Sequence, residues 1–324
     1  MSKDNYTTDD YFENENQVSI ALSLGGSVRR VVDVDTGEIA PDSAEVSCQQ
    51  DTARGRAPLS TSHISPFIEW TAGASLFKVC GGGSWERSGG GLRRSITGFS
   101  DNSRRGLMRK IACVRMDAEL PVFVTLTYPS VFPDPKQSKK HLDKFIKRLR
   151  RKFPAVGGIW KLEPQERGAP HFHILLWGSD EAALRAWVPY AWHSVAGDGD
   201  SNHLLFHLGA LGNEPCVNAV RSFRGVWFYA SKYLGKTFEV AGWNSKETGR
   251  FWAVFNPSCI PFGEKMVMRV TLEDAHKWMR YQKRFSKVRL RSGSPSFTIY
   301  CTADQWAGNV IRSYEGGDKN LIEW

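Results

Sequence analysis

The chain has 324 residues and a mass of 36.4 kDa, which is long enough for one large domain or two small ones. Hydrophobic residues make up 41% of it and charged residues 24%, as in ordinary globular proteins, and no apolar run approaches the roughly 20 residues of a membrane helix. The net charge is +9, but residues 1–100 carry 9 basic and 13 acidic side chains, so the excess of positive charge lies wholly in residues 101–324.

This basic part of the chain indicates a polyanionic partner, of which nucleic acid is the commonest. The six cysteines are scattered without a C-x-x-C pair, which argues against a disulfide scaffold and against a zinc ribbon. The first 17 residues are polar and acidic, unlike a secretory signal. We therefore expect a cytoplasmic protein that has no membrane partner.

Residues 1–105 are expected to form a poorly patterned N-terminal extension. Within it, residues 28–40 predict a small hairpin, because an Asp-Thr-Gly sequence supplies turn residues at 35–37. Glycines at 81–83 and 89–91 flank a polar stretch that is typical of a flexible linker. We expect the main domain boundary near residue 105.

A strand and a helix follow this boundary. Residues 121–128 are mostly β-branched or aromatic and end at Pro129, which predicts a central strand. Residues 137–152 predict a helix, which Pro154 ends. Its apolar side chains recur at spacings of three and four residues, as in a single buried stripe, and they are Leu142, Phe145, Ile146 and Leu149.

The same helix is densely basic. Nine of the seventeen residues from 136 to 152 are lysine or arginine, and only Asp143 opposes them. A run of like charges is often just a solvated face, but this density favours contact with phosphates. The residues that we expect to bind DNA are Lys144, Lys147, Arg148 and Arg151.

Two further strands are predicted at 157–163 and 170–177, joined by the turn-rich sequence PQERGA. A short helix at 180–188 and another at 222–236 follow, separated by a loop. The order strand, helix, strand, strand, helix predicts an α+β fold with a ferredoxin-like or RRM-like antiparallel sheet and helices on one face.

We place this domain at residues 106–245. Residues 246–324 are expected to form a C-terminal extension that packs on or beside it. The extension is expected to contain a helix at 267–285 and a strand at 296–301.

The central candidate for chemistry is a histidine pair. His171 and His173 are two residues apart on a predicted strand, so both imidazoles project from one face. If the hairpin turns near residue 167 or 168, the carboxylate of Glu163 lies on the same face, whereas Glu166 sits in the turn. This nitrogen and oxygen donor set suits Mg²⁺ or Mn²⁺ for phosphate chemistry, or Zn²⁺.

A second candidate lies at residues 229–236. On a helix, Tyr229 and Tyr233 lie one turn apart on one face, and Lys232 and Lys236 form another such pair. A tyrosine hydroxyl beside lysines can act as a nucleophile toward a phosphodiester. The alternative is an amphipathic helix with two core tyrosines.

The sequence GKT at 235–237 imitates the end of a P-loop, but Ala230 stands where the first glycine is needed. No complete P-loop occurs elsewhere in the chain, so we expect no use of ATP.

These pieces together resemble the HUH endonucleases that initiate rolling-circle replication, especially those of bacterial plasmids and phages. The resemblance rests on residues 123–129, on Glu163 followed by His171-Phe172-His173, and on Tyr229-Ala-Ser-Lys232. The doubled tyrosine resembles the two-tyrosine members of that group. The resemblance covers residues 120–240.

The resemblance implies a metal-dependent nickase and strand transferase that acts on single-stranded or hairpin origin DNA in a bacterial cell. The tyrosine would become linked to the 5′ phosphate and leave a free 3′ hydroxyl for host polymerase, with a host helicase as a further partner. HUH transposases and relaxases use the same chemistry, and a non-catalytic DNA-binding repressor of the replicon is the alternative from another class.

Overall fold

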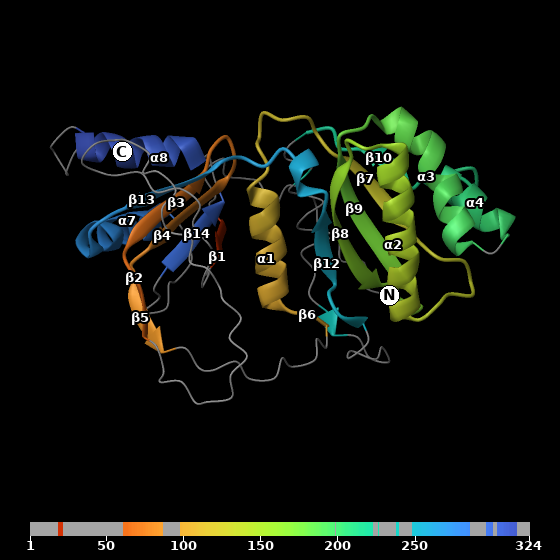
Figure 1. Cartoon of the computed structure of the whole chain (residues 1–324), viewed down its shortest axis with the longest axis horizontal. Helices are drawn as coiled ribbons and strands as arrows, with labels where there is room; N and C mark the ends of the chain where they lie inside the picture. The colour runs from red at the N-terminus through yellow and green to blue at the C-terminus, as the bar shows by residue number, and fades with distance from the viewer. Residues whose placement is uncertain are drawn as a thin grey trace. The chain divides into compact units, whose positions relative to one another are not determined.

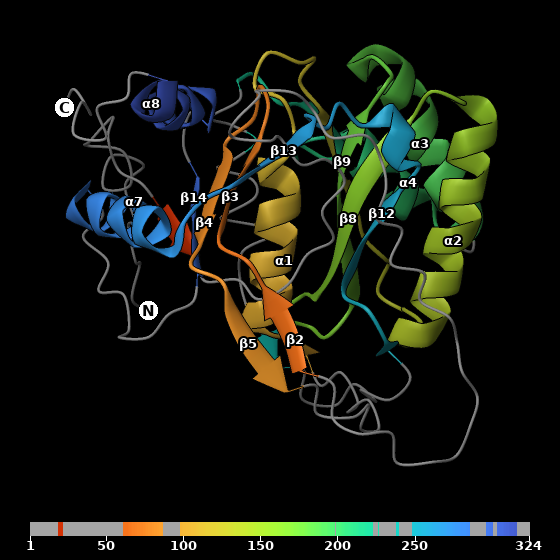
Figure 2. The ribbon, with the colours of Figure 1, turned by 60° about the vertical axis from the view of Figure 1, so that its left-hand side comes forward.

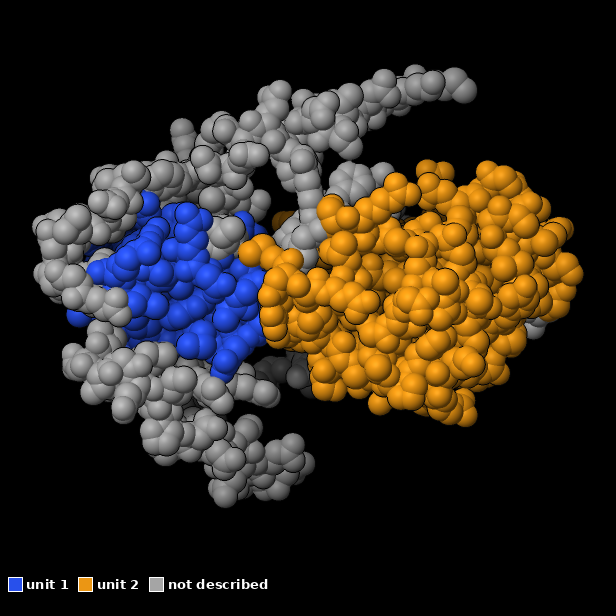
Figure 3. Space-filling view, turned by 90° about the horizontal axis from the view of Figure 1, so that it is seen from above, with its two compact units in different colours: residues 1–91, 263–324 blue, residues 92–262 orange. Residues whose placement is uncertain are grey.

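The computed structural model describes the following residues: 19–21, 61–86, 98–197, 199–222, 226, 238–239, 248–285, 296–300 and 303–315 (Figure 1). The chain divides into two compact units, which Figure 3 colours separately. Unit 1 combines residues 1–91 with residues 263–324, and unit 2 consists of residues 92–262. These divisions differ from the expected boundaries at 105 and 245.

Unit 2 is built on a five-stranded antiparallel sheet with the order β10-β7-β9-β8-β12. The first four of these strands have the order of a ferredoxin-like split β-α-β unit, and β12 extends the sheet beyond β8. The predicted α+β fold with an antiparallel sheet is therefore confirmed. The elements of this sheet and its crossover helices are β7 (Val122–Leu126), α2 (Pro135–Lys152), β8 (Gly157–Pro164), β9 (Pro170–Trp177), α3 (Glu181–Ala196), β10 (Val217–Ala219) and β12 (Trp252–Phe255).

The two faces of this sheet are covered by different helices. The ring of Phe172 on β9 contacts Trp192 of α3, and Trp192 in turn contacts Phe145 of α2, so α2 and α3 cover the Phe172 face. On the opposite face, α1 (Asp101–Ala112) approaches β12, because a Cβ on Gly106 would lie 3.3 Å from the Trp252 ring. Figures 1 and 2 both show β8 and β12 between α1 and α2.

The helices of unit 2 depart from the predicted ones at two places. α3 continues to Ala196 through Pro189, which is buried inside the helix, whereas the sequence pattern predicts an end at residue 188. α4 (Ser201–Leu208) occupies part of the expected loop. Asp200 caps the start of α4, and Gly209 ends it in the left-handed conformation.

Unit 1 contains a second antiparallel sheet with the order β1-β14-β4-β3-β13. Strands from both ends of the sequence pair in this sheet, so the expected N-terminal and C-terminal extensions share one core. Its strands are β1 (Ser19–Ala21), β3 (Phe67–Thr71), β4 (Leu76–Cys80), β13 (Lys265–Arg269) and β14 (Ser296–Tyr300). Two helices pack on one face of it, α7 (Leu272–Phe285) and α8 (Ala303–Glu315).

The predicted helix at 267–285 is wrong in its first turn. Residues 265–269 form β13, and α7 begins only at Leu272. Thr271 explains this start, because its hydroxyl accepts a hydrogen bond from the backbone N–H of Asp274 at 3.1 Å.

The remaining short elements are β2 (Thr61–Ile64), β5 (Gly83–Glu86), β6 (Gly98–Phe99), β11 (Phe238–Glu239) and the 3₁₀ helix η3 (Pro257–Cys259). The predicted hairpin at 28–40 lies outside the described residues, as does most of the predicted helix at 222–236. None of the described helices is long and apolar enough to cross a membrane.

His207 ties α4 to the end of β7. Its Nε2 accepts a hydrogen bond from the backbone N–H of Thr127 at 3.2 Å, and its Nδ1 donates to the carbonyl of His203 at 2.9 Å. The side chain is 1% exposed. Burial lowers the pKa of His207 to about 4, so the neutral ring makes both hydrogen bonds.

We expect this burial to make the protein less stable in acid. An unfolded histidine titrates near 6.5, so the unfolded chain binds one more proton at this residue between about pH 6.5 and 4, and stability falls as the pH is lowered through that range. The substitution His207→Gln should reduce the slope of the unfolding free energy against pH by about 1.4 kcal/mol per pH unit at most. Urea denaturation at a series of pH values measures this slope. The control is His276→Gln, which removes an exposed histidine on α7 and should leave the slope unchanged. Equal slopes for wild type and His207→Gln would contradict the prediction.

Candidate metal centre

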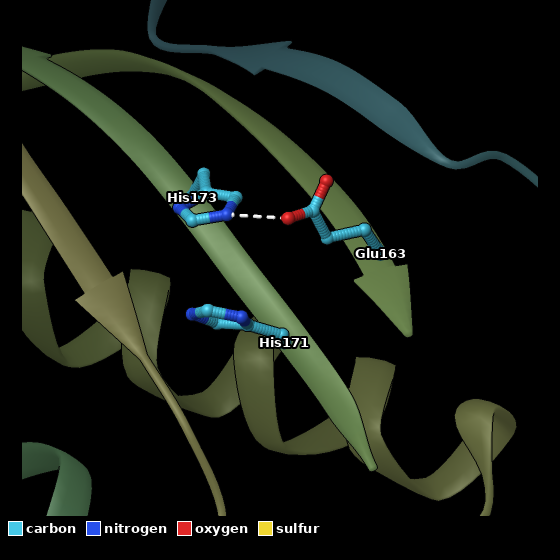
Figure 4. Close-up of side chains that lie close together, drawn as sticks. All are labelled: Glu163, His171 and His173. Carbon is cyan, nitrogen blue, oxygen red and sulfur yellow. Dashed lines mark hydrogen bonds and ion pairs between the residues drawn. The ribbon is translucent and has the colours of Figure 1, made fainter. Parts of the chain in front are cut away.

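The β8–β9 hairpin brings the three predicted ligands together. In its antiparallel register Glu163 pairs with His171 and Lys161 pairs with His173, so these four side chains share one face of the sheet. Gly168 closes the turn with φ +81°, a conformation that favours glycine. Figure 4 shows Glu163 from β8 and both histidines from β9 pointing toward one another.

The ligand atoms of this Glu163–His171–His173 trio all lie within 4.8 Å of one another. Nε2 of His173 lies 2.7 Å from Oε1 of Glu163, and the two imidazole rings are 4.4 Å apart. His173 is buried, and its ring stacks on Phe123 of β7 at 5.4 Å. The trio is therefore held by strands on both sides of β9.

Lys161 is a part of this site that the sequence did not reveal. Its side chain is fully buried, and its Nζ donates to Oε2 of Glu163 at 3.1 Å. The same ammonium lies 4.6 Å from the centre of the Phe99 ring. Glu163 is thus gripped at both oxygens, by Lys161 at one and by His173 at the other.

The protonation states match what metal ligands require. Burial opposes the charge on Glu163, but the hydrogen bond and charge of His173, together with the ammonium of Lys161, hold the pKa of Glu163 at about 2. Burial and the neighbouring His173 lower the pKa of His171 to about 3. At neutral pH, Glu163 is therefore an anion and His171 is a neutral ligand.

The trio also fits a divalent cation by its donor atoms. Nε2 of His171 is buried and has no hydrogen-bond partner among the described residues, a costly state for a polar atom that a bound cation would relieve. Two imidazoles and one carboxylate suit Mn²⁺ or Zn²⁺, and Mg²⁺ accepts such a set when water completes its shell. The arrangement could hold one such ion.

The candidate nucleophiles cannot be placed beside the trio. Tyr229, Lys232, Tyr233 and Lys236 all lie outside the described residues.

The candidate DNA-binding residues lie on α2, on the opposite face of the sheet from the trio. Leu142, Phe145 and Leu149 of α2 are buried. Lys144, Lys147, Arg148 and Arg151 are exposed. Two of them have partners, since Lys147 pairs with Asp143 at 2.6 Å and Arg148 donates to the hydroxyl of Ser194 at 2.6 Å. The basic surface of α2 is thus open to a ligand but separate from the trio.

One comparison with known proteins finds a family match. The sequence model of the ORF2-type replication-associated protein family matches residues 121–238, which is just over a third of the chain and lies within unit 2. No curated protein and no solved structure matches the chain. The matched segment contains the whole trio and supports a role in replication initiation.

We expect the carboxylate at position 163 to be essential for metal binding. Glu163→Gln removes an anionic ligand and should weaken Mn²⁺ binding by at least tenfold to hundredfold, since even changes to groups that only orient metal ligands cost about 10–100-fold. Calorimetric titration with Mn²⁺ measures this loss.

The matched control is Glu166→Gln, which removes an exposed carboxylate three residues away in the turn and should leave the affinity unchanged. An equal loss in both variants, or in neither, would contradict the assignment of the trio.

Proposed function

We propose that this protein initiates rolling-circle replication by nicking single-stranded or hairpin origin DNA through a tyrosine nucleophile. The observation that carries the proposal is the trio itself, which lies within the segment that matches the replication-associated family. A replication role alone leaves open a protein that only binds DNA. A buried donor set with an ionised carboxylate and a neutral histidine favours phosphodiester chemistry.

In this proposal, Glu163, His171 and His173 hold Mg²⁺ or Mn²⁺, which when bound polarises the scissile phosphate. Lys161 keeps Glu163 ionised and oriented through its hydrogen bond to Oε2. The side chains that the sequence nominates for attack are Tyr229 and Tyr233, with Lys232 and Lys236 beside them.

The proposed reaction conserves the energy of the broken bond. The tyrosine oxygen forms a bond to phosphorus while the bond from phosphorus to the 3′ oxygen breaks. The tyrosine loses its proton, and the 3′ oxygen gains one. The free 3′ hydroxyl then serves host polymerase, and a later attack on the phosphotyrosine rejoins the strand without ATP.

A covalent adduct is the direct test of this chemistry. Labelled single-stranded DNA that tiles the region flanking the gene should form a denaturation-resistant complex with the wild-type protein in Mg²⁺ or Mn²⁺. The double variant His171→Ala/His173→Ala should form none, because two of the three ligands are gone. An adduct that forms equally in the double variant and in EDTA would exclude the metal mechanism, and a wild type that binds but never forms an adduct would favour a repressor.

Mass spectrometry of the trapped peptide in the same experiment identifies the nucleophile. We expect Tyr229 to carry the DNA, because the sequence from 229 to 232 matches the Y-x-x-K pattern best. Tyr229→Phe should therefore lose most initial nicking, whereas Tyr233→Phe should nick once and fail in repeated turnover. An adduct on Tyr233 alone, or on neither tyrosine, would overturn this order.

The basic surface of α2 makes a separate prediction about affinity. Replacing the four residues Lys144, Lys147, Arg148 and Arg151 with glutamine should weaken binding to single-stranded DNA of any sequence. Each side chain that no longer neutralises a phosphate should reduce the slope of log affinity against log salt by about 0.7. Fluorescence anisotropy at several salt concentrations measures this slope.

A triple variant of unit 1 controls for net charge alone, because it also removes three positive charges: Arg269→Gln, Lys277→Gln and Arg280→Gln. Its salt slope should stay close to that of the wild type. If both variants lower the slope alike, or if the α2 variant leaves it unchanged, the α2 surface is only solvated.

A further inference from the structure

A pocket with a volume of about 380 Å³ lies at the end of the strands that carry the trio. We call it the end pocket. Its walls come from the residues after β7, from the turn between β8 and β9, and from α4. Its volume lies toward the small end of the range for small-ligand pockets, roughly 300–1,000 Å³. The lining residues that matter here are Thr127, Gln165, Arg167, Asp200, Asn202 and Phe206.

The end pocket is close to the trio along each strand. Gln165 is two residues beyond Glu163, and Thr127 is two residues beyond Thr125, which pairs with His173. Two residues along a strand span about 7 Å. The charge of Arg167 also contributes to the lowered pKa of His171. A strand of DNA whose phosphate lies at the trio therefore places a neighbouring nucleotide within reach of the pocket.

Arg167 builds the wall of the pocket. Its guanidinium donates to the carbonyl oxygens of Tyr128 at 2.5 Å and Pro129 at 2.7 Å, and to Oε1 of Gln165 at 3.1 Å. These hydrogen bonds tie the β8–β9 turn to the segment after β7. The pocket is thus formed before any ligand arrives.

The chemistry of the lining fits a nucleobase better than a phosphate. The carboxylate of Asp200 would repel an anion, whereas it can accept a hydrogen bond from an exocyclic amino group. Asn202 and Gln165 are amides, which offer both donors and acceptors to the edge of a base. The Phe206 ring is 43% exposed and provides an apolar surface on which a base can stack.

We propose that the end pocket holds one unstacked base of the DNA strand, next to the phosphate that is cut, and that it selects the identity of that base. This rests on the proposed function, in which single-stranded DNA crosses the trio. Phe206 stacks on the base, and Asn202 reads its edge. The pocket thereby fixes which phosphate of the strand reaches the trio.

The test is a binding selection from a single-stranded DNA pool of random sequence, carried out in EDTA so that no nicking occurs. The wild-type protein should enrich one base at one position by about tenfold over the others. Asn202→Ala should lose the preference at that position and keep the preferences elsewhere. Unchanged preferences in Asn202→Ala, or a uniform loss at all positions, would overturn the proposal.

Phe206→Ala tests the stacking surface with a matched control. Affinity for the selected sequence should fall about tenfold, within the range found when a base loses its aromatic platform. Leu205→Ala removes a neighbouring exposed apolar side chain on α4 that does not line the pocket, and it should bind like the wild type. A wild-type affinity in Phe206→Ala, or equal losses in both variants, would also overturn the proposal.

The selection and the adduct assay separate this proposal from the proposed function. An adduct in the wild type together with unchanged preferences in Asn202→Ala would remove the end pocket and leave the nicking chemistry. A lost preference in Asn202→Ala without any adduct in the wild type would support the pocket and remove the nicking chemistry.

Discussion

The antiparallel register between β8 and β9 decides which side chains share the face that carries the trio. Side chains alternate along a strand, so a slip of one residue would send Glu163 to the face where Phe172 packs against Trp192. That face is filled by the fully buried side chains of Phe172, Ile174 and Leu176. The hydrophobic core, rather than the site itself, therefore holds the ligands in position.

The trio sits in a network of buried charge that is balanced internally. An isolated buried ion costs several kcal/mol, and a cation paired with a carboxylate recovers part of that cost. Lys161 supplies a permanent cation beside Glu163, and Phe99 covers that cation from the other side. Glu163 is consequently an anion in the protein alone. Its charge does not depend on the arrival of a divalent ion.

The sequence predicted the elements whose signals are local. The β8–β9 hairpin and α2 have clear periodicity and clear ends, and α2 begins after Asp134, which caps it. α4 was missed because its eight residues are too few for a recognisable stripe, although Asp200 and Gly209 mark its ends. The pairing of β3 with β13 joins residues nearly 200 positions apart, which no local pattern encodes.

The site was predictable to a similar degree. Two histidines two residues apart, with a carboxylate across a tight turn, are placed on one face by strand geometry alone. Lys161 was not predicted, because a lysine on a strand is normally exposed and its burial depends on Phe99 from a distant segment. The end pocket was not predicted either, since α4 and the hydrogen bonds of Arg167 form it.

The positions of the trio and of the basic side of α2 limit the length of DNA that can touch both. A sheet and a packed helix layer are together about 20 Å thick, taking roughly 10 Å for each. Successive phosphates of one strand of B-form DNA advance by about 3.4 Å, so a path around the edge of the sheet takes at least six nucleotides. An oligonucleotide shorter than this can occupy one surface but not the other. A DNA hairpin avoids this restriction, because its stem and its single-stranded arm leave the junction in different directions.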